Sequence, residues 1–168
     1  MKLRPTSTQA QTSVNLVFDI ETDGIDSSCI HCVVTQDIDT GQVMEYNDQA
    51  SKNYSVVNAV CDLETADNII SHNGIMFDVP EIKKHFPFWE GKAKHWDTLI
   101  LSRFFHPNLL DIDLRRKWHM MPARLYGSHS LKPMATDYNV TKMTLVKQLT
   151  GRIGHKKCRI TADKTLLS

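Results

Sequence analysis

Short apolar runs of strand type alternate along the chain with stretches of helical pattern, and this alternation most constrains the fold. The strand-type runs cover residues 14–20, 29–35, 42–46 and 68–71, and the helical patterns cover residues 56–67, 79–86 and 98–105. A turn at residues 37–41 joins the second and third runs and predicts a three-stranded meander. Asp97 is predicted to cap the last helix. The alternation predicts an α/β domain whose mixed sheet is flanked by helices.

The charge distribution divides the chain after residue 131. Residues 1–131 hold 12 Lys and Arg against 17 Asp and Glu, a balance of −5, whereas residues 132–168 hold 8 against 2, a balance of +6. Such a shift marks a boundary. We therefore expect a polar extension at residues 1–13, a folded domain at residues 14–131 and a basic tail at residues 132–168. The tail has the composition of either a nucleic-acid-binding arm or a disordered segment.

The composition also excludes some classes of protein. No apolar run approaches the roughly 18–20 residues that span a bilayer, and the polar N-terminus lacks the apolar stretch of a secretory signal. The four cysteines are too few for a disulfide scaffold. We therefore expect a cytoplasmic protein with no membrane partner.

Two carboxylates, Asp19 and Glu21, stand at the end of the first apolar run. Residues two apart on a strand point to the same face, where two carboxylates repel each other and are costly to desolvate. A bound cation would remove this cost, and oxygen ligands select Mg²⁺ or Mn²⁺. The alternative is that the strand ends here and that both groups are solvated.

A second polar cluster at residues 71–81 runs from a strand, through a turn that contains glycine, into a helix. Asp78 is either a functional carboxylate or the N-cap of that helix, with Glu81 completing a capping box. The residues before it have ordinary structural interpretations as well, because His72 and Asn73 suit a turn and Phe77 suits the core.

Together the two clusters resemble the DEDD family of 3′–5′ exonucleases, whose fold is ribonuclease H-like. Asp-Ile-Glu-Thr follows an apolar strand, and His-Asn-Gly-x-x-Phe-Asp places its Asp 59 residues after the first one. Residues 96–103 and 127–131 further resemble the proofreading domain of short-tailed phage family A DNA polymerases. The resemblance covers residues 14–131, and it implies a ribonuclease H-like α/β fold that is incomplete at its C-terminus.

The resemblance also implies a reaction that uses two Mg²⁺ (or Mn²⁺) ions. Asp19 would contact both ions, Glu21 would hold the ion on the side of the attacking water, and Asp78 would hold the other. A single-stranded 3′ end of DNA would be the partner, in the cytoplasm of an infected bacterial host. The residues expected to contact the nucleic acid are His72, Asn73 and Phe77.

The family's third motif, a Tyr followed four residues later by an Asp, is absent from this sequence. The residues four positions after Tyr54, Tyr126 and Tyr138 are an Asn, a Ser and a Lys. Back-translation of the tail, read two bases later, is compatible with Gly-Tyr-Arg-Leu and then with Tyr-Cys-Arg-Gln-Asp. We therefore expect a single-base deletion near residues 132–133 to have put the tail out of frame, a hypothesis that the coding DNA tests directly.

These features predict the proofreading exonuclease portion of a phage replicative DNA polymerase, truncated before the polymerase domain and impaired by loss of the third motif. One alternative is a small stand-alone DNA or RNA exonuclease in which Asp111 or Asp113 replaces the missing ligand. Another is a non-catalytic module that binds single-stranded nucleic acid through its basic tail.

Overall fold

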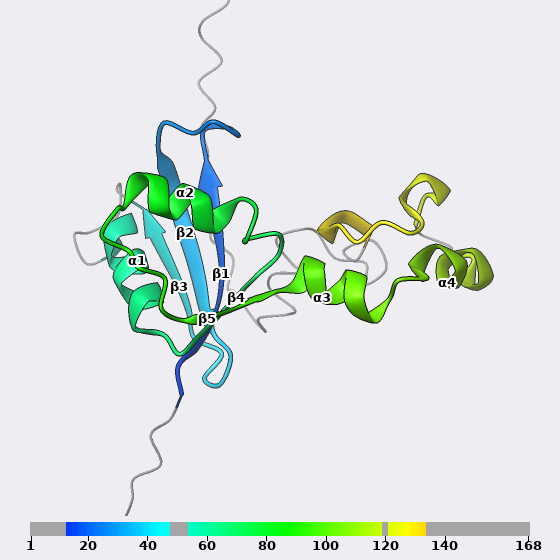
Figure 1. The fold of residues 1–168 in the computed structure, drawn as a ribbon, viewed down its shortest axis with the longest axis horizontal. Helices are drawn as coiled ribbons and strands as arrows, with labels where there is room; N and C mark the ends of the chain where they lie inside the picture. Colours follow the sequence, from blue (N-terminus) through cyan, green and yellow to red (C-terminus); the bar gives the residue numbers. More distant parts are fainter. Residues whose placement is uncertain (1–12, 48–53, 119–120, 134–168) are drawn as a thin grey trace, which may run out of the picture.

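Five strands form one mixed sheet in the order β3-β2-β1-β4-β5 (Figure 1). The computed structural model describes residues 13–47, 54–118 and 121–133. β1 pairs antiparallel with β2 and parallel with β4, while β3 and β5 form the two edges. The strands are β1 (Asn15–Thr22), β2 (Ile30–Asp37), β3 (Val43–Asn47), β4 (Asn68–Ser71) and β5 (Lys94–Asp97). This order confirms the predicted meander and the mixed α/β sheet.

The central strand β1 has two different faces because its side chains alternate. Leu16, Phe18 and Ile20 are buried, whereas Val17 and Asp19 between them are only partly buried. The apolar face contributes to the core, and the other face carries the carboxylates. One-residue alternation thus turns Asp19 and Glu21 away from the packed side of the sheet.

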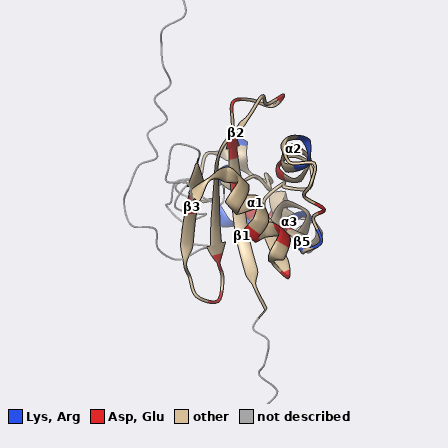
Figure 2. Ribbon diagram, turned by 90° about the vertical axis from the view of Figure 1, so that its left-hand side faces the viewer, with Lys and Arg blue, Asp and Glu red and all other residues tan. Residues whose placement is uncertain are grey.

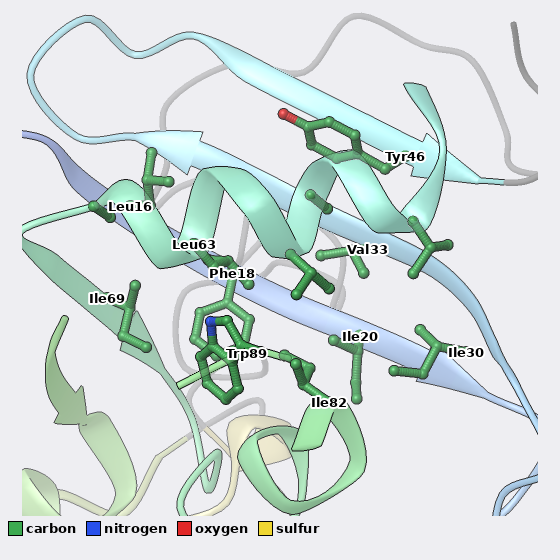
Figure 3. Packing of buried hydrophobic residues seen from close by; sticks show 14 residues of the cluster. Leu16, Phe18, Ile20, Ile30, Val33, Tyr46, Leu63, Ile69, Ile82 and Trp89 are labelled. Atoms are coloured by element: carbon green, nitrogen blue, oxygen red, sulfur yellow. The ribbon is translucent and has the colours of Figure 1, made fainter. Parts of the chain in front are cut away.

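Two helices cover the apolar face of the sheet. α1 (Val56–Thr65) contributes Val56, Ala59, Val60 and Leu63 to the core, and α2 (Asp78–His85) contributes Ile82. Figure 3 shows Phe18, Ile82 and Trp89 together in this cluster. Both α1 and α2 therefore pack on the same side of the sheet.

The remaining helices extend away from the sheet as an arm (Figure 1). They are α3 (Thr98–Phe105), α4 (Leu109–Arg116) and the short 3₁₀ helix Ala123–Leu125. α3 has no buried residue, although its sequence is strongly apolar. No helix in these described ranges is long and apolar enough to cross a membrane.

Most predicted bounds lie within one or two residues of the observed ones, and the main differences are three. The first strand continues to Thr22 rather than ending at residue 20, and β5 and α4 were not predicted. β5 has only four residues, of mixed polarity, and it forms by parallel pairing with β4. Residues 1–12 of the expected extension (1–13) and residues 134–168 of the expected tail (132–168) lie outside the described residues.

Candidate active site

All six residues that the sequence predicts for the site line one cavity of about 810 Å³. The cavity lies beside the C-terminal part of β1, the loop that follows it, the start of α2 and residues 127–132. The structure therefore brings the two sequence clusters together, although His72 lies 50 positions after Thr22 in the chain. The six are Asp19, Glu21, His72, Asn73, Phe77 and Asp78.

Asp19 and Glu21 are held within β1 rather than at its end. Asp19 lies opposite Val34 of β2, and it is partly buried, while Glu21 is exposed. The register shifts only after Glu21, at Thr22. The strand therefore does not end before Glu21, and the two residues share one face as predicted. The alternative holds only in that Glu21 is solvated.

Asp78 is the first residue of α2 and not its N-cap. Phe77 occupies the cap position, and it makes no side-chain capping bond. The predicted capping box is also wrong, because the carboxylate of Glu81 accepts a hydrogen bond from the Ser27 hydroxyl. Asp78 is 4% exposed, yet it lines the cavity.

The turn that carries Asn73 is held by the carboxylate of Asp97. Asp97 caps α3 by accepting from the N–H groups of Leu99 and Ile100, at 2.9 and 3.3 Å. It also accepts from the N–H groups of Asn73 and Ile75, at 3.0 and 3.1 Å. Burial raises the pKa of Asp97, but these four donors outweigh it and lower the pKa below its ordinary value. The predicted cap is confirmed, and it fixes one wall of the cavity.

Asn73 adopts a left-handed backbone conformation, with φ of 65°. Asn tolerates this conformation better than most residues, and its carbonyl accepts from the N–H groups of Met76 and Phe77. His72 Nδ1 lies 2.9 Å from Thr98 Oγ1. Phe77 both packs against the core and lines the cavity. The structural interpretations of these residues are therefore compatible with a place in the site.

His95 supports this turn from the core side of β5. Its Nε2 lies 2.6 Å from Ser71 Oγ, and its ring packs against Phe18. Burial lowers the pKa of His95 below its ordinary value of 6.5, and the charge of Asp97 opposes this only in part. The folded protein therefore favours the neutral imidazole.

This arrangement predicts that acid destabilises the fold near pH 6. The unfolded chain takes up a proton on His95 as the pH falls through 6.5, whereas the folded chain does so only at lower pH. We expect the unfolding free energy to fall between pH 7.5 and 5.5, and to fall less in His95→Gln. Urea unfolding at several pH values measures this, with His31→Gln, at an exposed position of β2, as control. Equal slopes for the native chain and His95→Gln would contradict the expectation.

Basic side chains that the sequence did not single out line the same cavity. They are Arg103 in the last turn of α3, together with His129 and Lys132. His129 Nδ1 lies 2.8 Å from Ser102 Oγ, so this contact ties His129 to α3. The cavity thus combines three carboxylates with basic groups, which suits a phosphate-containing ligand. Arg103 and His129 could have been found from the sequence, because they lie in residues 96–103 and 127–131, the segments that resemble the phage polymerases.

Comparisons with known proteins give this cavity a context. A model of the RNase H superfamily matches residues 16–150 of the chain. The chain belongs to the RNase H superfamily. The match covers both sequence clusters and the basic residues of the cavity, and it also includes the first part of the predicted tail.

Two phage proteins are similar to this RNase H superfamily chain. It is 30% identical over 139 residues to the DNA-directed DNA polymerase of Escherichia phage T7. It is 30% identical over 138 residues to the DNA-directed DNA polymerase of Enterobacteria phage T3. Each match covers 76% of the chain and 19% of the relative, so the chain spans about a fifth of the length of these polymerases. The matches confirm the resemblance to phage DNA polymerases.

Asp111 and Asp113 do not line the cavity of this RNase H superfamily chain. Asp113 is buried, and it accepts from Trp118 Nε1 at 2.9 Å and from the N–H group of Gly127 at 2.8 Å. It therefore fastens α4 to the segment that leads to His129. This structural role does not support the alternative in which either aspartate replaces a metal ligand.

The carboxylates of the site line one cavity without forming a ready-made ligand set. Within the described parts of the chain, no group of three or more His, Cys, Asp or Glu side chains is arranged to hold a metal ion. The donor chemistry nevertheless suits Mg²⁺, which prefers carboxylate oxygens and keeps several waters. Gly74 leaves space beside Asp78, because a Cβ there would lie 3.2 Å from Asp78 Oδ2.

Proposed function

We propose that the chain is the 3′–5′ exonuclease portion of a phage replicative DNA polymerase and removes nucleotides from a single-stranded 3′ end during proofreading. The observation that carries this proposal is that Asp19, Glu21 and Asp78 line one cavity together with basic side chains. A phosphodiester is an anion that needs both kinds of group: cations to bind it, and carboxylates to hold the metal ions that cleave it.

The choice of DNA as substrate rests on the relatives. Both are DNA-directed DNA polymerases, and the chain covers 19% of each. The cavity by itself supports a phosphodiester substrate of either kind. RNA is therefore the alternative substrate, and the assay below distinguishes the two.

Asp19, Glu21 and Asp78 would hold two Mg²⁺ or Mn²⁺ ions. When bound, such ions lower the pKa of a coordinated water and stabilise the oxygen that leaves the phosphate. The protein supplies the placement: β1 presents two of the carboxylates on one face, and α2 presents the third. The glycine at position 74 keeps the space beside Asp78 free.

The other residues of the cavity would bind and orient the DNA strand. Phe77 would offer an apolar surface to the terminal base, since unstacked bases bind aromatic side chains well. His72 and Asn73 would lie beside the terminal nucleotide. Arg103 and Lys132 would contact phosphates and offset the repulsion between the carboxylates and the DNA backbone.

The proposal includes reduced activity, because the sequence lacks the third motif. Its aspartate would be a fourth carboxylate for the metal ions. We propose that residues 133–168 are out of frame. Reading the coding DNA beyond residue 131 tests this part independently of any assay.

The test of the proposal is release of nucleotides from a 3′-labelled single-stranded oligonucleotide by the full chain. We expect slow release with Mg²⁺ or Mn²⁺ and none after EDTA, because the carboxylates alone cannot activate water. A 5′-labelled DNA strand should shorten in single-nucleotide steps, and a matched RNA strand should be cut more slowly. Binding of the strand without any metal-dependent release would contradict the exonuclease and favour the single-strand-binding module.

A further inference from the structure

A buried polar cluster outside the cavity ties α2 to the loop at residues 23–29, which joins β1 to β2. The Ser27 hydroxyl, in a residue that is 3% exposed, donates to Glu81 Oε2 and lies 2.9 Å from His85 Nε2. His85 Nε2 is also 3.5 Å from Glu81 Oε2. We call Ser27, Glu81 and His85 the α2 clasp. None of the three lines the cavity.

Lys84 reinforces the clasp from the same helix. Its Nζ donates to the carbonyl oxygen of Ser27 at 2.7 Å and to Asp26 Oδ1 at 3.1 Å. The carboxylate of Glu81 is buried, and a buried charge is costly unless polar partners surround it. Acidic and basic positions lie side by side along α2 (Figure 2). The helix therefore presents a matched set of partners to the loop.

Hydrogen bonds between its two ends close the loop at residues 23–29. A contact at one residue of the loop therefore restricts the movement of the others. The carboxylate of Asp23 accepts from the hydroxyl of Ser28 and from the N–H groups of Ser28 and Cys29. Ser27, with Asp26 beside it, attaches this loop to α2.

Both of the parts that the clasp joins reach the cavity. The loop begins next to Glu21 and contributes Gly24 and Ile25 to the lining. α2 begins with Asp78, which lies three residues before Glu81 and thus on the same side of the helix. A shift of the helix at Glu81 would move Asp78 as well.

We propose that the α2 clasp sets the width of the cavity between Glu21 and Asp78, with Ser27, Glu81 and His85 as positioning residues for the metal-binding carboxylates. The part that concerns metal ions rests on the proposed function. The clasp itself concerns only the relative placement of the loop and the first turn of α2. Because these carboxylates come from different elements, their spacing depends on such a tertiary contact.

The test compares Ser27→Ala with Tyr46→Phe in the full chain. Tyr46 is a matched control, because its buried hydroxyl also donates to a carboxylate, that of Asp62, and neither residue lines the cavity. We expect both variants to lose stability. Only Ser27→Ala should bind Mn²⁺ about tenfold more weakly in calorimetry, the scale of one hydrogen bond to a charged group. Glu81→Gln should bind Mn²⁺ nearly as the native chain does, since its amide oxygen still accepts from Ser27.

Native-like Mn²⁺ affinity in Ser27→Ala, together with a lowered melting temperature, would show a purely stabilising cluster and overturn the proposal. If the native chain neither binds Mn²⁺ nor shortens DNA, the proposed function fails. Amide hydrogen exchange then tests whether the α2 clasp holds the first turn of α2 in place. The Val79 N–H, which donates to the carbonyl of Gly74 at 2.8 Å, should then exchange faster in Ser27→Ala but not in Tyr46→Phe. Unchanged exchange at Val79 in both variants would overturn the clasp as well.

Discussion

Replacing Asp19 by alanine is expected to abolish metal-dependent release of nucleotides from a 3′-labelled strand. Asp19 is the partly buried carboxylate at the centre of the sheet, and it lines the cavity with Glu21 and Asp78. A bound metal ion contributes several kcal/mol to stabilisation of the transition state. Since each 1.36 kcal/mol corresponds to a factor of ten in rate, the expected loss is about a thousandfold.

The variant should nevertheless remain folded. Removing Asp19 also removes its repulsion by Glu21, so we expect a melting temperature equal to or slightly above that of the native chain. Asp111→Asn, at an exposed position of α4 outside the cavity, is the matched control and should retain native activity. Equal rates for Asp19→Ala and the native chain would show that the measured nuclease is a contaminant. A loss in Asp111→Asn alone would instead favour the alternative set of metal ligands.

Among glycine-to-alanine substitutions at the site, Gly74→Ala is expected to lower the stability of the fold most. The new Cβ would lie 1.8 Å from Ser71 Oγ and 2.7 Å from Ser71 Cβ. Ser71 cannot easily move, because it belongs to β4, is 3% exposed and contacts His95. Overpacking of this kind costs about 1–3 kcal/mol. We expect the melting temperature to fall by roughly 2–12 °C for a chain of this size.

The same substitution should also impair metal binding, since the Cβ would approach Asp78 Oδ2. Gly24→Ala is the control, because Gly24 lines the cavity but has no atom within 4 Å of a built Cβ. It should melt as the native chain does. A double variant, Ser71→Gly with Gly74→Ala, should recover part of the lost stability because it removes both contacts. A melting temperature of Gly74→Ala equal to that of the native chain would contradict the close packing described for this turn.

Elements with strong local signals could be predicted from the sequence. The strand β4 and the helix α3 have the predicted bounds, since β4 is an apolar run and Asp97 provides a capping side chain. β5 and α4 could not be predicted in this way. β5 has four residues of mixed polarity, and it becomes a strand through its pairing with β4. Its formation depends on a partner that is distant in sequence.

In the site, too, some residues could be predicted from local sequence and others depend on contacts between distant segments. Asp19 and Glu21 could be placed on one face from the two-residue period of a strand, and the resemblance connected them with Asp78. The N-cap interpretation of Asp78 was wrong, because α2 begins at Asp78 itself and Phe77 holds the cap position. Glu81 instead accepts from Ser27, on a loop 54 residues earlier in the chain. Arg103 and His129 were missed because no local pattern brings the end of α3 to the cavity.

The sequence by itself determined the α/β class, the residues of the two acidic clusters and the superfamily to which the chain belongs. The class and the acidic residues follow from periodicity and capping chemistry, which act over a few residues, and the superfamily follows from the resemblance of the motifs to a known family. Only the tertiary structure decided that both clusters share one cavity, that basic side chains face them, and that α2 is fastened to the loop after β1. Such contacts join residues far apart in the chain, and packing of the sheet against α1 and α2 brings them together.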